Sequence, residues 1–215
     1  MKKVAIFGAG GFGKEVANLI GRINYNSPTW DLIGFFDDNA LLHGKLISHY
    51  GPCLGGINEL NDWKDSICVV LAIASSSILR NIVGKITNPL VSFPNLIDPS
   101  YFIVDPKTFT IGKGNIIQGL GCASCDVVLG DFNIFNDSVV VGHDTIIEDY
   151  NIVMPGVRIS GNVKIGHDNF FGVGSIVLQG LTIKNGVHLS AGSVMVTKPK
   201  DNSLYIGNPA RLFSY

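Results

Sequence analysis

The first part of the chain alternates short apolar runs with segments whose apolar residues recur at helical spacing. The run VAIFGAG ends in glycine, and the residues after it place apolar side chains three or four positions apart. Ser75 to Ser77 offer a helix N-cap later in the chain. The expected strands are residues 4–10, 32–38, 67–74 and 90–97, and the expected helices are residues 12–23 and the segment that follows Ser77. This alternation predicts an α/β fold with a small parallel sheet.

From residue 109 to residue 198 the pattern changes to a period of six. The third position is apolar in all fifteen hexads of this stretch. Such a period predicts a solenoid in which each hexad forms one short strand and one corner, and three hexads close one coil. The third side chain then points inward, and successive coils pair as parallel strands. Glycine, asparagine and aspartate at the corners are expected to supply the positive φ that tight turns need.

These two patterns predict two domains. We expect a Rossmann-like α/β domain over residues 1–95, a connector over residues 96–108, a β-helix over residues 109–198 and a C-terminal tail over residues 199–215. The 26 glycines occur in both parts, and 14 of them lie within the hexads. Glycine therefore needs one explanation in the α/β domain and another in the repeats.

Composition excludes several classes of protein. Hydrophobic residues make up 46% of the chain and the net charge is −1, which argues against a disordered protein. No apolar run approaches the ~20 residues that a membrane-spanning helix needs, and Lys14 and Glu15 interrupt the first apolar stretch too early for a signal peptide. Lysine and arginine are not clustered, so nucleic acid is not an expected partner. We therefore expect a cytoplasmic protein.

A glycine-rich turn stands between the first expected strand and the first expected helix. Residues 8–13, GAGGFG, fit the pattern G-x-G-x-x-G, whose glycines let backbone N–H groups approach a phosphate at a helix N-terminus. Asp37 or Asp38, at the end of the second strand, could hold a ribose hydroxyl. A domain of about 95 residues is small for a dinucleotide, so a nucleotide-sugar is favoured over NAD. The alternative is a turn that only packs the helix on the strand.

Two of the five histidines occupy equivalent positions in the repeats. His143 lies in VGHD and His167 in IGHD, and both hold the same place in their hexads. Either imidazole could act as a general base near neutral pH, and either could be a solvated corner residue. They are four hexads apart, so they lie on different corners and cannot serve one site within a subunit. Spacing alone does not choose between them.

The sequence has few cysteines and histidines at the spacing of metal ligands. Only Cys122 and Cys125 form a C-x-x-C, and a structural zinc site would require a second pair of ligands at similar spacing. We interpret both cysteines as small apolar side chains. A zinc-bearing β-helix of the carbonic anhydrase type would need two histidines a few residues apart, and the histidines of the repeats are more widely spaced. No metal is expected.

The order of the motifs resembles one known family. The hexads are similar to those of the hexapeptide-repeat acyltransferases, whose fold is a left-handed parallel β-helix. GAGGFGKEV, FFDD, VVGHDTIIEDY and the ending YIGNPAR together resemble the nucleotide-sugar acetyltransferases within that group, which include sialic acid O-acetyltransferases and bacillosamine and perosamine N-acetyltransferases. The resemblance implies direct acetyl transfer from acetyl-CoA to a nucleotide-linked sugar. It also implies a homotrimer with each active site between neighbouring β-helices.

The resemblance also assigns roles to residues of this chain. It implies that His143 is the catalytic base, that Asp144 raises its basicity, and that a backbone N–H near Gly161 polarises the thioester. The implied acetyl-CoA contacts are Ile152, Val173 and Ala191, and the implied nucleotide-sugar contacts are Gly10, Gly11, Phe12, Asp37, Asp38 and Ala74. Phe12 and Ile152 stand where histidine is common in the family. Because adjacent strand residues face opposite ways, the pairing of His143 with Asp144 requires a bend at the corner.

We therefore predict an acetyl-CoA-dependent acetyltransferase that acts on a nucleotide-linked 4-amino-4,6-dideoxy sugar in surface-glycan biosynthesis. One base could equally serve a hydroxyl, so sugar O-acetylation of the sialic acid type stays an alternative. A non-catalytic nucleotide-binding trimer and an NAD-dependent enzyme are the alternatives from other classes.

Overall fold

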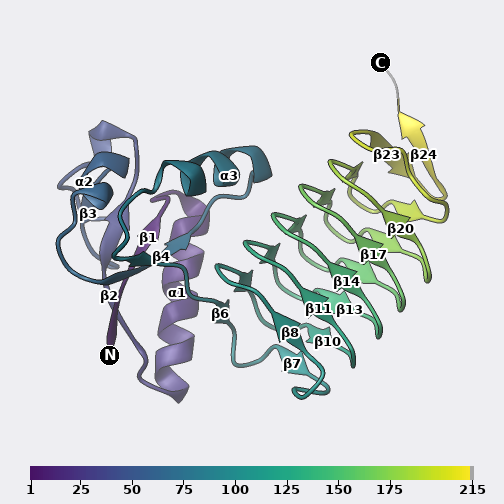
Figure 1. Cartoon of the computed structure of the whole chain (residues 1–215), viewed down its shortest axis with the longest axis horizontal. Coiled ribbons are helices and arrows are strands. Elements are labelled where there is room, and N and C mark those ends of the chain that lie inside the picture. Colours follow the sequence, from purple (N-terminus) through teal and green to yellow (C-terminus); the bar gives the residue numbers. More distant parts are fainter. Residues whose placement is uncertain (214–215) are drawn as a thin grey trace. The chain divides into compact units, whose positions relative to one another are not determined.

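The computed structural model describes residues 1–213 and divides the chain into two compact units. The first unit is Met1–Asp98, and the second begins at Pro99. Ser214 and Tyr215, the last two residues of the expected tail, lie outside the described residues. Figure 1 shows a helix-bearing unit at the N-terminus and a stack of short strands at the C-terminus.

The first unit is a five-stranded parallel sheet in the order β3-β2-β1-β4-β5. Its strands are β1 (Lys2–Phe7), β2 (Trp30–Phe36), β3 (Cys53–Gly55), β4 (Ile67–Leu71) and β5 (Val91–Ser92). The helices are α1 (Gly11–Asn26), the 3-10 helix η1 (Ala40–Leu42), α2 (Ile57–Asn61) and α3 (Ser76–Lys85). Among residues 1–213, no helix combines the length and the apolar character that crossing a membrane would require.

The apolar runs correctly predict β1, β2 and β4 and the helices α1 and α3. The hydrophobic pattern missed η1, β3 and α2, because elements of three to five residues are too short to show a period. Ser75 is the N-cap residue of α3, but its side chain makes no capping hydrogen bond. Residues 90–97, expected as one strand, contain two separate short strands, β5 and β6 (Leu96–Ile97), because residues 93–95 are not in a strand.

The second unit is a parallel β-helix with three faces. Face 1 contains β7 (Phe102–Ile103), β10 (Cys122–Ala123), β13 (Val140–Val141), β16 (Arg158–Ile159), β19 (Ile176–Val177) and β22 (Val194–Met195). Face 2 contains β8 (Thr110–Ile111), β11 (Val128–Leu129), β14 (Ile146–Ile147), β17 (Lys164–Ile165) and β20 (Thr182–Ile183). Face 3 contains β9 (Ile116–Ile117), β12 (Ile134–Phe135), β15 (Ile152–Val153), β18 (Phe170–Phe171), β21 (His188–Leu189), β23 (Leu204–Gly207) and the antiparallel β24 (Ala210–Phe213). Strands therefore extend to both sides of the hexad stretch.

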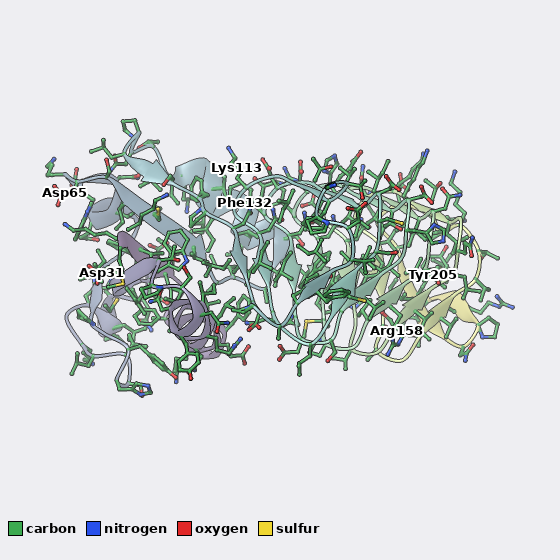
Figure 2. All side chains as sticks on the ribbon, turned by 90° about the horizontal axis from the view of Figure 1, so that it is seen from below. Asp31, Asp65, Lys113, Phe132, Arg158 and Tyr205 are labelled. Atoms are coloured by element: carbon green, nitrogen blue, oxygen red, sulfur yellow. The ribbon has the colours of Figure 1, made fainter. Side chains whose placement is uncertain are left out.

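Each two-residue strand is formed by the second and third positions of a hexad. The third side chain is inward, as expected. The second is exposed on several strands, as Arg158 is at the edge of the β-helix (Figure 2), but is buried at Ile116, Ile134 and Ile152 on face 3. The first position is inward as well. Four asparagines at this position, Asn115, Asn133, Asn151 and Asn169, are fully buried one above another. Each Oδ1 accepts the backbone N–H of the residue 18 positions later, which ties successive coils together.

The corner backbone has the expected positive φ at glycine, asparagine and aspartate, and the structure shows which hexad position carries it. Positive φ occurs at the sixth position of every hexad from Gly114 to Gly192, including those with Asp, Asn, Leu, Phe, Ser or Tyr there. The repeated glycines at the fourth position do not have positive φ. They are needed because the next coil is close, and a Cβ on Gly142 would lie 2.4 Å from the backbone N of Gly161. Fourth-position glycine therefore reflects coil spacing, and turn conformation is set two residues later.

The buried asparagines give a prediction about stability. Asn151→Ala removes an Oδ1 that accepts two N–H groups of Asn169 and an Nδ2 that donates to Asn133 and to the carbonyl of Gly166. Because these partners stay buried, we expect the free energy of unfolding to fall by about 2–3 kcal/mol. Urea unfolding measures this change. The exposed Asn26 at the end of α1 is the control, and Asn26→Ala should leave the unfolding midpoint unchanged.

Candidate active site

The glycine turn separates into packing glycines and open glycines. A Cβ on Gly13 would lie 1.9 Å from the carbonyl oxygen of Gly8, and Gly8 itself has a φ of +109°. These two glycines let α1 pack closely on β1. Gly10 and Gly11 are exposed, and a Cβ on either would meet nothing within 4 Å. The turn therefore packs the helix and also leaves its outer backbone open to a ligand.

Asp37 supports the turn directly. Its Oδ2 accepts the backbone N–H of Ala9 at 2.8 Å, and its Oδ1 accepts the N–H of Asn39 at 2.9 Å. Asp38, the next residue, accepts the N–H of Ile57 at the start of α2. The sequence suggested Asp37 or Asp38 as a ribose ligand but gave no sign of these backbone contacts. Asp37 is thus a structural partner of the glycine turn whatever else it binds.

The expected nucleotide-sugar residues lie at the carboxyl ends of neighbouring parallel strands. Gly10, Gly11 and the half-buried Phe12 follow β1, the two aspartates follow β2, and the exposed Ala74 follows β4. This edge is where open α/β sheets bind ligands. The first turn of α1 has no acidic residue and no side-chain cap, so its N–H groups and the positive end of the helix dipole are available to an anion. The N–H of Gly56 on the β3 side lowers the pKa of Glu59 by donating to it.

His143 lies at the corner between faces 1 and 2. Its Nδ1 is 2.6 Å from Oδ2 of Asp144. Because an ionised carboxylate can only accept a hydrogen bond, Nδ1 carries a proton. In the neutral form of the ring, Nε2 then has the lone pair that can accept a proton. Within residues 1–213, Nε2 has no hydrogen-bond partner. The side chain of His143 is 51% exposed. Asp144 has a φ of 56°, and this bend brings its carboxylate to the preceding ring as the corner pairing requires.

The coil after His143 contributes Gly161 to the same corner. The residues of the fifth hexad position here are Cys125, His143, Gly161 and Gln179, one from each successive coil. The N–H of Asn162 donates to the carbonyl of His143 at 2.7 Å and holds these two coils together. The N–H of Gly161 makes no hydrogen bond within the described part of the chain. The corner thus offers an unpaired imidazole nitrogen beside an unpaired backbone donor.

His167 lies at the corner between faces 2 and 3, where side chains cap the backbone. Lys113, Asp131, Asp149 and His167 each donate their N–H to the side chain 18 residues later, with Asn185 as the last acceptor. His167 Nδ1 accepts from the N–H of Asp149, and its Nε2 is 2.8 Å from Oε2 of Glu148. Both ring nitrogens are therefore engaged. The two histidines differ in environment, which their identical hexad positions concealed.

The residues expected to contact acetyl-CoA lie on three successive coils. Ile152 is on face 3 with its side chain fully buried, so only its backbone could meet a ligand. Val173 and Ala191 are exposed and follow β18 and β21 at the corner between faces 3 and 1. Face 1 separates them from the corner of His143 and Gly161. The structure therefore does not bring the two groups together within one chain.

The remaining candidates show no metal geometry. Across residues 1–213, no group of three or more His, Cys, Asp or Glu side chains is arranged to hold a metal ion. Cys122 lies on face 1 and Cys125 at the corner, and neither is in a disulfide. His188 stacks near Phe170 with ring centroids 4.5 Å apart, and partial burial lowers the pKa of His188.

Comparison with known proteins covers both units. Residues 3–86 match the family model of the PglD N-terminal domain. The chain is similar to the acetyltransferase domain of PglB from Neisseria gonorrhoeae FA1090, solved with acetyl coenzyme A, at 29% identity and a TM-score of 0.88 over 99% of both chains. WeeI from Acinetobacter baumannii AYE matches at 26% identity and a TM-score of 0.87, over 99% of this chain and 100% of that one. PerB from Caulobacter crescentus, solved with CoA and GDP-perosamine, matches at 25% identity and a TM-score of 0.84, over 100% and 98%.

These matches confirm the predicted fold. They extend over the whole chain, so the α/β unit and the β-helix occur together in the same order in the related proteins. The second unit is accordingly a left-handed parallel β-helix, which follows a Rossmann-like N-terminal domain. Residues 3–86 thus match the PglD N-terminal domain, and the chain as a whole is similar in structure to the acetyltransferase domain of PglB.

Proposed function

We propose that this protein transfers the acetyl group of acetyl-CoA to the amino group of a nucleotide-linked 4-amino-4,6-dideoxy sugar, in the cytoplasm and for surface-glycan biosynthesis. The observation that carries the proposal is the arrangement of His143, whose Nδ1 is held by Asp144 while its Nε2 has no partner in the described part of the chain. Acetyl coenzyme A in the PglB structure and CoA with GDP-perosamine in the PerB structure support this choice of substrates.

His143 acts as the general base in this proposal. The acceptor nitrogen attacks the thioester carbonyl carbon, and Nε2 takes the proton that the nitrogen loses. Asp144 holds the ring in the correct tautomer and stabilises the imidazolium that forms. The N–H of Gly161 donates to the carbonyl oxygen, where negative charge develops. When the carbon–sulfur bond breaks, the imidazolium returns the proton to the leaving thiolate, so the products are an amide and a thiol.

The α/β unit binds the nucleotide part of the acceptor. Gly10 and Gly11 leave the N-terminus of α1 open, and its N–H groups can bind the phosphates. Oxygens of Asp37 or Asp38 bind a ribose hydroxyl, and Ala74 lies along the same strand edge. Phe12 can pack against a base or sugar but cannot donate a hydrogen bond to phosphate. This difference bears on which nucleotide the enzyme prefers.

The complete active site uses two copies of the chain. Val173 and Ala191 lie on the other side of face 1 from His143. One face is formed by about six residues, which span ~20 Å when extended. A neighbouring β-helix can place its Val173 corner beside the His143 corner of the first copy. This arrangement supports a homotrimer in which every active site lies between two subunits.

Removal of the base tests the reaction. His143→Ala should lower kcat for acetyl transfer by roughly 10²–10⁴-fold, since a positioned base contributes about that much. His167→Ala is the matched control, because that histidine has the same hexad position but both nitrogens engaged in the corner. Release of CoA thiol, measured with a panel of UDP-, dTDP-, GDP- and CMP-linked amino and hydroxy sugars, gives the rates. Unchanged transfer by His143→Ala would exclude this mechanism, and transfer only to hydroxyls would favour O-acetylation.

The open glycine turn gives a second prediction. Gly11→Ala places a methyl group where the turn is now open, so KM for the nucleotide sugar should rise roughly tenfold, a cost of about 1.4 kcal/mol in binding. The KM for acetyl-CoA should not change. Gly21→Ala lies in the same helix with equally open space and serves as the control. Equal KM values in both variants would show that phosphate does not approach this turn.

A further inference from the structure

The imidazole of His143 lies against Gly161 of the next coil. A Cβ on Gly161 would be 2.6 Å from Nε2, 2.8 Å from Cε1 and 2.9 Å from Cδ2 of His143. Real Cβ atoms do not approach other heavy atoms this closely. The ring thus occupies the space that a side chain at position 161 would need.

The opposite edge of the ring is also fixed. Nδ1 is held at 2.6 Å by Asp144, whose backbone N–H donates to the carbonyl of Cys125 in the preceding coil. Asn162 donates to the carbonyl of His143 from the following coil. The ring is therefore confined between Asp144 on one edge and the Cα of Gly161 on the other, and it cannot move away from Gly161 without changing its contact with Asp144.

The backbone does not account for glycine at position 161. Its φ lies outside the left-handed region, so an L-residue could adopt the same conformation. The equivalent positions on the neighbouring coils carry Cys125, His143 and Gln179, which shows that this corner accepts side chains. Only the coil directly after His143 has no side chain there. The absence of a side chain at position 161 leaves room for the ring of His143.

We propose that Gly161 is a positioning residue, whose lack of a side chain holds the His143 imidazole in the orientation that pairs Nδ1 with Asp144 and presents Nε2 to the acceptor. This inference rests on the proposed function for its catalytic consequence. Its geometric part, the orientation of the ring, is independent of the substrate. A backbone contact of Gly161 with the thioester would not require glycine, because every non-proline residue has an N–H.

The kinetic test compares Gly161→Ala with Gln179→Ala. The added methyl must displace the ring, and a displacement of about 1 Å from the reacting atoms can cost ~10²-fold in rate, so kcat should fall by about that factor. KM for acetyl-CoA and for the nucleotide sugar should stay within about twofold, because the variant keeps the N–H that meets the thioester and the proposed nucleotide contacts lie on the α/β unit. Gln179→Ala, at the same corner one coil further, should keep the kcat of the native enzyme. A Gly161→Ala enzyme with native kcat would overturn the proposal.

A second measurement does not depend on activity. Imidazole ¹⁵N chemical shifts report which nitrogen of neutral His143 carries the proton, with His143→Ala used to assign the signals. The native protein should show the Nδ1–H tautomer, and Gly161→Ala should shift the ring toward the Nε2–H tautomer. An unchanged tautomer in Gly161→Ala would overturn the positioning role even if acetyl transfer is established. A clear tautomer change in a protein that transfers no acetyl group would instead refute only the proposed function.

The double variant covers the case in which Gly161→Ala does not fold. Once the imidazole is absent, the methyl has no clash partner, so His143→Ala/Gly161→Ala should fold and melt like His143→Ala alone. Failure of the double variant to fold would place the conflict in the backbone and would overturn the proposal.

Discussion

The β-helix depends on one constraint, the close stacking of coils that repeat every 18 residues. Parallel strands lie ~4.8 Å apart, so each side chain lies directly beside the residue one coil away. Asn133, Asn151 and Asn169 use this spacing to pass hydrogen bonds from coil to coil inside the β-helix. Gly142 is needed where the backbone of the next coil is too close for a side chain. Packing at any corner is therefore decided by residues 18 positions away.

This constraint gives two similar histidines different surroundings. At the corner of His167 the neighbouring coils supply Asp149 and Asn185, and the imidazole becomes one member of a series that caps backbone N–H groups. At the corner of His143 the next coil supplies Gly161, which offers no side chain to bind or block the ring. Nε2 then has no hydrogen-bond partner among residues 1–213, and the His143 side chain is half-exposed. The difference in hydrogen bonding between the two imidazoles comes from the neighbouring coils, not from the tetrapeptides VGHD and IGHD.

The α/β unit shows a similar division among adjacent residues. Gly8 and Gly13 are required for close packing, whereas Gly10 and Gly11 leave backbone open at the N-terminus of α1. Asp37 connects the two strand ends by accepting the N–H of Ala9. One short motif therefore both packs a helix and leaves backbone open at the N-terminus of that helix. The same strand edge carries the residues that the family resemblance assigned to the nucleotide sugar.

The sequence by itself determined the two units and their order, because apolar periods of 3.6 and six residues extend over many positions and specify which side chains are buried. It also indicated where an anion and a general base could be placed. It did not reveal β3 or α2, which are too short to show a period, nor the asparagine series, whose members are 18 residues apart. The family resemblance selected His143 over His167, but the different surroundings of the two imidazoles are decided only by the tertiary structure. Coil stacking places Glu148 and Asp149 against His167 and Gly161 against His143, although these residues are 18 or 19 positions apart in the chain.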